Sequence, residues 1–514
     1  MQSLIRLKPS KRTLRRACFY LLLAFSFLGT RPIWDPDEGR YTNVALNMLE
    51  SGDWVHPMRS HEAGHWTKPP LTYWAIAASV GGFGYSPWAA RLPAALSFLA
   101  CIFLAGRLAR RLAPEREHVA RLVFATMGLP LAAATLITTD FLLAATLALA
   151  MWGYVEARFG DRERSRRWVL LMWLGFGLAF LTKGPPALLP WLPIVAMELL
   201  GSPLRRVRLF RPEAIGLFLL LSFGWFAWVT AEQPALISYF LGDEVVRRIA
   251  GDGFDRNAQW YGWLLVYAPT LLLGSLPWTG RLLKSLATAP RLLQDWWPQR
   301  HDADVASEAQ VLTLLWLALP LAVLCLAQSR LPLYMLPLFV PLALLVAQTP
   351  GATPRLGYGL VIWLLCLLGL RLAVAWWPTH KNAEQWADAI RERAPGRVRE
   401  VVFVDDMARY GLHLHLGAEV EKLSLADPET NALDREADHG FRLELSEDEP
   451  GIVFVTKVEQ FAGLNEVIQA IGQHAVLLGE PYRDRAIFAV VPNKHCLPEC
   501  LAANFEPGQA SGQN

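Results

Sequence analysis

The chain has 514 residues, 53% of them hydrophobic and 18% charged, with a mean hydropathy of +0.25. Soluble domains are about a quarter charged, so the composition excludes an ordinary soluble protein, and long apolar runs indicate a polytopic membrane protein. The formal net charge of +3 is small, and we expect a lipid bilayer and no nucleic acid among its partners.

The N-terminus is basic between Arg6 and Arg16 and carries no acidic residue there. An apolar run follows, without a small-residue cleavage site after it. This pattern predicts an uncleaved first span with its basic end in the cytoplasm.

Further apolar runs recur along the chain and predict an all-α membrane bundle of about 11–13 transmembrane helices. The runs lie at 17–30, 86–106, 119–138, 141–156, 168–181, 187–200, 213–230, 261–279, 311–327, 332–348 and 357–377.

Arginine-rich segments separate several of these runs, at 107–121, 157–167, 202–212 and 281–310. With the N-terminus inside, strict alternation assigns all four segments to the cytoplasm, as the positive-inside rule expects. The charged residues nearest to apolar runs then fall on the extracytoplasmic face. Ionisable groups at membrane depth are costly, so this face is where we expect a functional site.

The first extracytoplasmic loop, 31–70, holds a dense acidic cluster. Asp37 and Glu38 are adjacent carboxylates that could bind a divalent cation or accept a proton from an attacking hydroxyl. Asp35 is interpreted as the N-cap of the helix that follows. The three histidines of the loop have no metal-ligand spacing and are expected to be solvated: His56, His61 and His65.

Two lysines are fixed by adjacent prolines. Lys68 precedes Pro69-Pro70, and Lys183 precedes Gly184 and a second proline pair. Two ammonium groups held on one face suit a phosphate or pyrophosphate ligand. The alternative is that each lysine reaches lipid headgroups.

Three other polar residues interrupt or border apolar runs. Asp140 stands between two such runs and is either functional or the N-cap of the span that begins at Phe141. Arg330 and Tyr334 lie in a proline-bracketed turn, where they could bind a phosphate.

The segment 231–260 has charged and apolar residues at helical spacing and predicts an interfacial helix. Its Asp243 and Glu244 could support the residues of a functional site or form interfacial ion pairs with Arg247 and Arg248, and we favour the ion pairs.

The composition becomes more polar after Trp377. We expect a transmembrane domain at 1–379, a soluble extracytoplasmic α/β domain at 380–505 and a disordered tail at 506–514. Within the α/β domain, EQWADAIRERA reads as a helix, and VVFVDD, GIVFVT and AIFAVV read as buried strands. Cys496 and Cys500 could form a disulfide there.

The motif DPDEGRYTNVALNMLESGDWVHP, followed by TKPPLTYW, resembles the first loop of bacterial GT-C membrane glycosyltransferases. The similarity is greatest to the lipid A aminoarabinose transferases, relatives of the protein O-mannosyltransferases. LTKGPPALLP and SRLPLYMLPLFVPLALLVA match later motifs in the same order, and the resemblance covers residues 15–350.

The resemblance implies a sugar donor on a polyprenyl (undecaprenyl) phosphate and an inverting transfer to an extracytoplasmic acceptor. That acceptor would be lipid A or another envelope glycan, glycolipid or protein. Asp37 matches the principal catalytic carboxylate, and Asp140 matches a second acidic position. The remaining matches, flanking the carboxylate or surrounding the lipid phosphate, are Arg40, Tyr41, Lys68, Lys183, Arg330 and Tyr334.

The sequence departs from this family at two positions. Thr67 stands where an acidic residue usually precedes the lysine, and Val245 stands where a His follows the later glutamate. A divalent metal is therefore doubtful, and no other cofactor is implied. A lipid-linked sugar flippase or transporter and an envelope glycan polymerase or ligase are the alternatives. Charged residues at span ends, without an internal repeat, favour a transferase over a transporter.

Overall fold

The computed structural model describes residues 10–61, 63–242, 256–351, 357–425, 441–445, 450–492 and 499–505. The predictions for Asp243, Glu244, Val245, Cys496 and the tail at 506–514 lie outside these residues, while Cys500 is disulfide-bonded. The chain divides into two compact units. The helical unit comprises Met1–Leu28 and Arg91–Val374, and the loop–sheet unit comprises Gly29–Ala90 and Ala375–Asn514.

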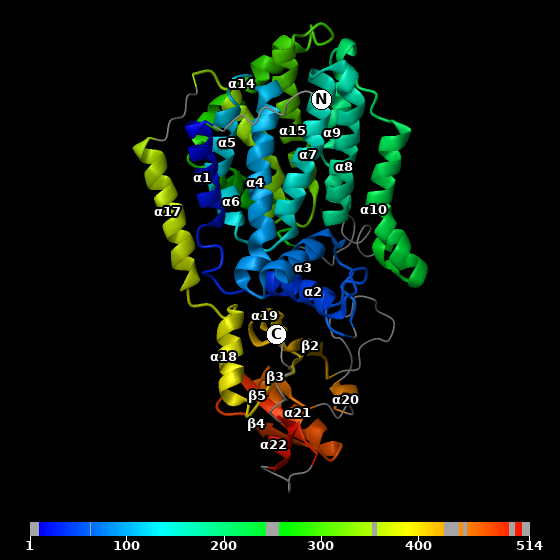
Figure 1. Ribbon diagram of the computed structural model, residues 1–514, viewed down its shortest axis with the longest axis vertical. Coiled ribbons are helices and arrows are strands. Elements are labelled where there is room, and N and C mark those ends of the chain that lie inside the picture. Colours follow the sequence, from blue (N-terminus) through cyan, green and yellow to red (C-terminus); the bar gives the residue numbers. More distant parts are fainter. Residues whose placement is uncertain are drawn as a thin grey trace, which may run out of the picture. The chain divides into compact units, whose positions relative to one another are not determined.

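The helical unit is built almost entirely from α-helices (Figure 1). Its helices are α1 (Lys11–Phe25), most of α4 (Pro87–Leu112), α5 (Glu117–Thr126), α6 (Gly128–Ala133), α7 (Thr139–Phe159), α8 (Ser165–Lys183), α9 (Trp191–Leu200), α10 (Pro212–Glu232), α11 (Leu236–Ser238), α13 (Gly262–Gly274), α14 (Thr279–Trp296), α15 (Val305–Leu326), α16 (Phe339–Gln348) and α17 (Tyr358–Ala375). Short 3₁₀ helices occur at η1 (Arg162–Arg164), η2 (Pro185–Leu188), η3 (Pro203–Arg205) and η6 (Pro332–Leu338).

Every apolar run in the sequence contains one of these helices, which confirms the predicted helical membrane bundle. Within the described residues, five helices are long and apolar enough to cross a membrane: α4, α7, α10, α15 and α17. One predicted span is wrong in detail. The run at 119–138 is divided because α5 ends at Thr126, Met127 is extended, and the short α6 follows.

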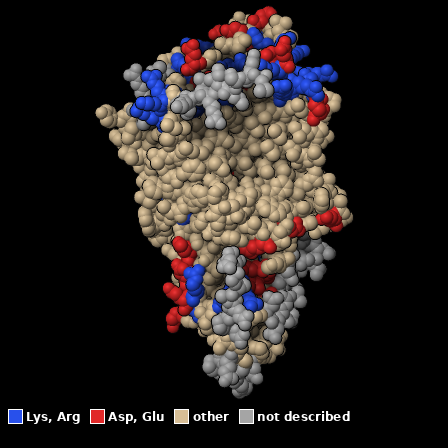
Figure 2. All heavy atoms as spheres, viewed as in Figure 1, with Lys and Arg blue, Asp and Glu red and all other residues tan. Residues whose placement is uncertain are grey.

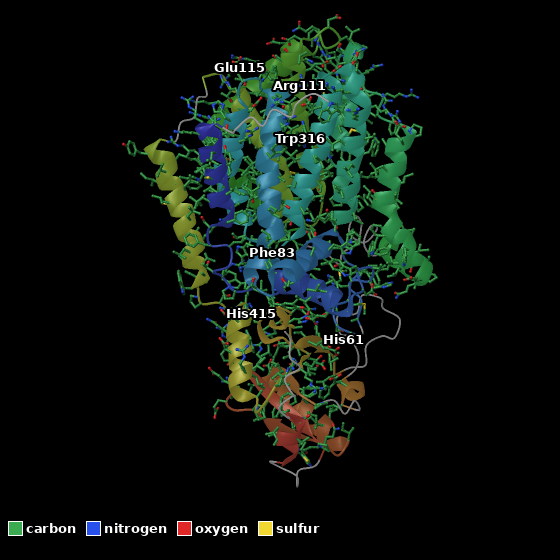
Figure 3. All side chains as sticks on the ribbon, viewed as in Figure 1. His61, Phe83, Arg111, Glu115, Trp316 and His415 are labelled. Carbon is green, nitrogen blue, oxygen red and sulfur yellow. The ribbon has the colours of Figure 1, made fainter. Side chains whose placement is uncertain are left out.

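Charged side chains are unevenly distributed over the helical unit. Figure 2 shows most lysines and arginines on the visible face of this unit gathered at one end of the bundle, beyond a wide surface of uncharged side chains. Figure 3 places Arg111 and Glu115 at this end and Trp316 within the bundle. A broad uncharged surface is what a lipid-facing bundle requires, because charge is costly in hydrocarbon.

Helices α7 and α8 pack along each other and position the polar residues at their ends. Two glycines allow this close approach. A Cβ on Gly153 would lie 2.5 Å from the backbone nitrogen of Met172, and one on Gly175 would lie 2.5 Å from that of Ala150. Small residues at such crossings let helix backbones come together in membrane proteins.

A buried ionic cluster joins the other end of α7 to two further helices. The Arg158 side chain is fully buried, and it donates to Glu198 of α9 at 2.9 Å and to Glu308 of α15 at 3.2 Å. Glu308 also accepts from the Ser202 backbone N–H and pairs with Arg205. Because each charge has partners, their attraction and hydrogen bonds offset the desolvation penalty of burying the cluster.

The loop–sheet unit combines the predicted first loop with the C-terminal residues. Its helices are α2 (Asp37–Ser51), α3 (Leu71–Phe83), α18 (Ala383–Arg393), α19 (Leu412–Leu416), α20 (Phe441–Glu444), α21 (Val458–Ala470) and α22 (Glu499–Asn504). Its strands are β1 (Glu400–Val404), β2 (Glu419–Leu423), β3 (Ile452–Lys457), β4 (His474–Leu477) and β5 (Arg485–Val491), in the sheet order β2-β1-β3-β5-β4.

The sheet is mixed: β2, β1 and β3 are parallel, whereas β5 runs antiparallel to β3 and β4. The helix and the three strands predicted from the sequence are confirmed as α18, β1, β3 and β5. Strands β2 and β4 were not predicted from the sequence. Alternate residues of β1 pack into two separate cores, with Val401 and Phe403 in one and Val402 and Val404 in the other.

The start of the first loop pairs with the residues that lead into α18. The Asp35 backbone N–H donates to the Lys381 carbonyl at 3.0 Å, and the Ala383 N–H donates to the Ile33 carbonyl at 3.1 Å. These bonds join parts of the chain that are more than 300 residues apart, and they explain why the loop and the sheet form one unit.

Candidate active site

The first candidate catalytic group is the exposed carboxylate of Asp37. Asp37 is the first residue of α2, where the positive end of the helix dipole favours an acid. Its Oδ1 accepts from Arg40 Nη2 at 2.6 Å, and its side chain is 57% exposed. The carboxylate is therefore oriented by one arginine and remains accessible to a reactant.

Glu38 has a different environment, although it is adjacent in the sequence. It is buried, its Oε1 pairs with Arg31 Nη2 at 2.6 Å, and its Oε2 accepts from the Trp34 N–H at 3.1 Å. These contacts close the loop onto the first turn of α2. Glu38 is thus arranged to hold the loop, while Asp37 remains accessible.

Tyr41 and Lys68 border the same part of the loop–sheet unit. Tyr41 is buried, with its ring centroid 5.8 Å from that of Tyr73 in α3. Lys68 is half-buried, and its Nζ donates to the Thr67 carbonyl at 2.6 Å. Helix α3 begins immediately after Pro70, so the proline pair fixes the backbone between Lys68 and this helix.

His65 corrects the expectation that the loop histidines are solvated. It is buried, its Nε2 lies 2.9 Å from Thr67 Oγ1, and its backbone N–H donates to the Pro57 carbonyl. Burial lowers the pKa of His65 well below its ordinary value, and the charges of Arg40, Arg59 and Lys68 lower it further. The imidazole is therefore neutral.

Three cations, Arg40, Arg59 and Lys68, consequently lie near one neutral ring. Arg59 is not marked by any sequence motif, because a lone arginine in a loop carries no pattern. His61, by contrast, is exposed as expected (Figure 3), and its backbone N–H donates to Glu419 at 2.6 Å.

Asp35 also differs from its sequence interpretation. The N-cap position of α2 is Pro36, and no side chain caps the helix. Asp35 is instead buried, and its Oδ1 accepts from the Gly411 N–H at 3.0 Å. Burial raises its pKa from 3.8 to about 7, although the Gly411 N–H and Arg409 act in the opposite direction. The residue therefore belongs to a contact within the loop–sheet unit.

A second polar cluster lies in the helical unit, at the adjoining ends of α7 and α8. Lys183, the last residue of α8, forms an ion pair with Asp140 in the first turn of α7. Its Nζ lies 4.4 Å from the centre of the Tyr334 ring, at cation–π distance. The N-cap of α7 is Thr138, so the alternative role of Asp140 as a helix cap is wrong.

Arg330 is buried, and its guanidinium faces backbone carbonyls. Nη1 donates to Asn257 at 2.6 Å and to Gln259 at 2.9 Å, and Nη2 donates to Cys325 at 3.1 Å. The Asn257 side chain donates back to the Arg330 carbonyl. In this arrangement Arg330 holds the chain around residue 257 against the start of η6.

The loop does not supply a good donor set for a divalent cation beside Lys68. At the position where the resemblance expects an acid, the Thr67 hydroxyl is bonded to His65, and three cations act on that imidazole. Positive charge around Thr67 opposes the binding of a divalent metal cation. Among the described residues, the only three acids close enough to share a metal are Glu400, Glu421 and Glu444, all in the C-terminal part of the chain.

Comparison with protein families gives one match within the helical and loop segments. Residues 67–229 match the family model described as dolichyl-phosphate-mannose-protein mannosyltransferase. This range includes Lys68, Asp140 and Lys183.

Two curated relatives from Pseudomonas fluorescens cover a larger part of the chain. An undecaprenyl phosphate-alpha-4-amino-4-deoxy-L-arabinose arabinosyl transferase 2 of strain Pf0-1 is 32% identical over 69% of this chain and 62% of its own length. An arabinosyl transferase 1 of strain ATCC BAA-477 is 32% identical over 72% of this chain and 67% of its own length. For the first of these, the match spans less than two thirds of the relative.

The fold also resembles a solved structure. ArnT from Cupriavidus metallidurans, crystallised with undecaprenyl phosphate, superimposes with a TM-score of 0.72 and 18% identity. The similarity covers 94% of this chain and 98% of that one, and its apo structure gives a TM-score of 0.71. The architecture of a helical bundle with a small mixed-sheet domain is therefore shared.

Proposed function

We propose that this protein transfers a sugar from a polyprenyl phosphate to an envelope acceptor. The chain belongs to the GT-C family of membrane glycosyltransferases, which includes the undecaprenyl phosphate-aminoarabinose arabinosyl transferases. The acceptor would be lipid A or another envelope glycan or protein. We place the protein in the bacterial inner membrane, with the first loop and the C-terminal domain on the extracytoplasmic face, on the basis of the arginine-rich segments.

The observation that carries this proposal is the environment of Asp37. An exposed carboxylate stands in a loop where three cations, Arg40, Arg59 and Lys68, act on one neutral imidazole. This combination suits a transferase with a phosphate leaving group. The carboxylate receives or orients the nucleophile, and fixed positive charge stabilises the departing phosphate.

In the proposed reaction, an acceptor oxygen attacks the anomeric carbon as the bond from that carbon to the phosphate oxygen breaks. The bonding electrons leave with the polyprenyl phosphate, and the configuration inverts. If the acceptor is a hydroxyl, its proton passes to Asp37; if it is a phosphate oxygen, no proton moves and Asp37 orients it. Within the helical unit, Lys183 would bind a donor phosphate oxygen, and Arg330 and Tyr334 would shape its surroundings. Within the loop–sheet unit, Lys68 is a second candidate for phosphate binding.

Asp140 would hold the Lys183 ammonium in place for this task, because the two form an ion pair beside the Tyr334 ring. The surroundings of Thr67 do not favour a divalent metal in this reaction. Glu38 would maintain the loop that presents Asp37.

The test is transfer by the purified full-length protein in lipid nanodiscs. The probes are undecaprenyl phosphate linked to radiolabelled aminoarabinose and, separately, to a labelled hexose, each offered with and without purified lipid A. Label appearing on lipid A together with free undecaprenyl phosphate would support the proposal. In proteoliposomes, movement of the intact donor between leaflets without sugar release would instead indicate a flippase.

A further inference from the structure

The loop that carries Asp37 packs closely against the residues around α19 of the C-terminal domain. Gly411, which precedes α19, donates its backbone N–H to the buried Asp35 carboxyl at 3.0 Å. Asp35 lies two residues before Asp37. Any displacement of Gly411 would therefore be transmitted directly to the start of α2.

Three additional hydrogen bonds connect α19 with the same loop. His415 Nε2 accepts from the Ile33 N–H at 3.2 Å, and Figure 3 shows His415 on α19. His413 bonds Asn43 at 2.8 Å through Nδ1 and Glu50 at 3.1 Å through Nε2. The contact thus includes both the segment before α2 and one side of the helix itself.

Two glycines determine how closely these elements approach. A Cβ on Gly39 would lie 1.8 Å from Asp35 Oδ1 and 2.6 Å from the Gly411 nitrogen. A Cβ on Gly411 would lie 2.6 Å from Ala383 Cβ and 3.0 Å from Ile33 Cγ2. Neither site accommodates a side chain without separating the domain from the loop.

We propose that the C-terminal α/β domain positions the catalytic carboxylate, with Asp35 and Gly411 as the positioning residues. This inference rests on the proposed function, in which Asp37 acts on the acceptor. Asp35 does not contact a reactant. It fixes the backbone that leads into α2. The hydrogen bond of Gly411 and the three hydrogen bonds of α19 fix the rotation of α2, and hence the direction of Asp37 and Arg40.

The experiment uses the full-length protein with Gly411→Ala and the matched control Gly463→Ala. Gly463 lies in α21 of the same domain, where an added Cβ meets no atom within 4 Å. We expect Gly411→Ala to lower kcat at least tenfold while KM for the lipid donor changes less than twofold, because donor-binding residues remain. Gly463→Ala should leave both constants unchanged.

A second pair of variants separates positioning from loss of structure. Asp35→Ala removes the acceptor for the Gly411 N–H and should lower kcat in the same way. Asp35→Asn retains an acceptor oxygen and the shape of the side chain, so it should restore at least half of the wild-type kcat. A kcat for Gly411→Ala and Asp35→Ala within twofold of the control would overturn the proposal.

Hydrogen–deuterium exchange makes the inference testable even if the proposed reaction is wrong. The amides of α2 should exchange at least tenfold faster in Gly411→Ala than in Gly463→Ala, while those of β1 and β3 keep their protection. Absence of transfer in the wild type would count against the proposed function alone, and exchange would still report on the contact. Equal protection of α2 in both variants would refute the positioning role.

Discussion

Lys183 at the end of α8 forms an ion pair with Asp140 at the start of α7, and its ammonium also lies 4.4 Å from the centre of the Tyr334 ring. The two charged side chains are only 12% and 7% exposed. The pair is formed by residues 43 positions apart, brought together because α7 and α8 pack closely through Gly153 and Gly175. A lysine held in this way differs from one that reaches lipid headgroups, because its position is set by two partners.

Asp140→Asn should therefore lower transfer at least tenfold, because Lys183 loses the charge that positions it. Lys183→Ala should weaken donor binding, measured as an increased Kd for undecaprenyl phosphate linked to radiolabelled aminoarabinose in nanodiscs. The matched control is Glu213→Gln, which breaks an exposed pair with Arg166. Exposed pairs contribute little, so this control should behave as the wild type. Unchanged donor binding in Lys183→Ala would remove the phosphate-binding role.

Asp37→Ala should abolish transfer with little change in the melting temperature of the detergent-solubilised protein, because the side chain is largely exposed. Substantial turnover in this variant would exclude Asp37 as the principal carboxylate.

Glu38→Gln should have the opposite profile. It leaves Arg31 buried with a neutral partner, and the loss of one member of a buried ion pair costs about 3 kcal/mol of stability. A lowered melting temperature with transfer retained below that temperature is expected. If Glu38→Gln were inactive and fully stable, Glu38 would have to be assigned a direct role in the reaction.

The buried cluster around Arg158 predicts a second stability effect, in the helical unit. Glu308→Gln would leave the fully buried Arg158 with one carboxylate fewer, at a cost of about 3 kcal/mol. Thermal melting of the detergent-solubilised variant measures this effect. A melting temperature equal to that of the wild type would show that water or a rearranged Glu198 compensates for the lost charge.

The pKa of Asp35 predicts how the loop–sheet contact depends on pH. Burial raises this pKa to about 7, so the folded state binds the proton more tightly than the unfolded state does. The contribution of Asp35 to stability is therefore greatest below pH 3.8, declines as the pH rises to about 7, and is constant above it. Glu38 supports the raised value and Arg409 opposes it.

Melting temperatures from pH 5 to pH 8 test this dependence. The wild type should lose stability over that range relative to Asp35→Asn, in which the side chain cannot ionise. Parallel curves for the two proteins would mean that Asp35 does not titrate in this interval.

Chelation tests the inference from Thr67 and His65. Transfer by protein dialysed against EDTA should remain within twofold of the untreated level, because positive charge near Thr67 opposes a bound divalent cation. Loss of transfer on chelation, restored by added metal, would require a metal site elsewhere. Melting with and without EDTA gives an independent readout of any structural metal.

Several features of this protein could be predicted from the sequence because they depend on local patterns. Apolar runs are long enough to specify helices, and arginine-rich segments separate them. Alternating and β-branched segments specified β1, β3 and β5. The motif around Asp37 and the lysines beside proline pairs indicated the family, which the relatives confirm. Local sequence predicted β2 and β4 less well, because the β2 segment is charged and the β4 segment is short. Both form strands only when paired with neighbouring strands.

Only the tertiary structure decided which of the indicated residues contact one another. Asp140 became an ion-pair partner of Lys183, and Asp35 became a contact for Gly411, 376 residues away in the chain. His65 became a buried neutral ring near Arg59, which no sequence pattern had marked. The physical reason is the same in each case. Burial and hydrogen bonding depend on what another part of the chain places beside a residue, whereas periodicity and composition depend only on its neighbours in the sequence.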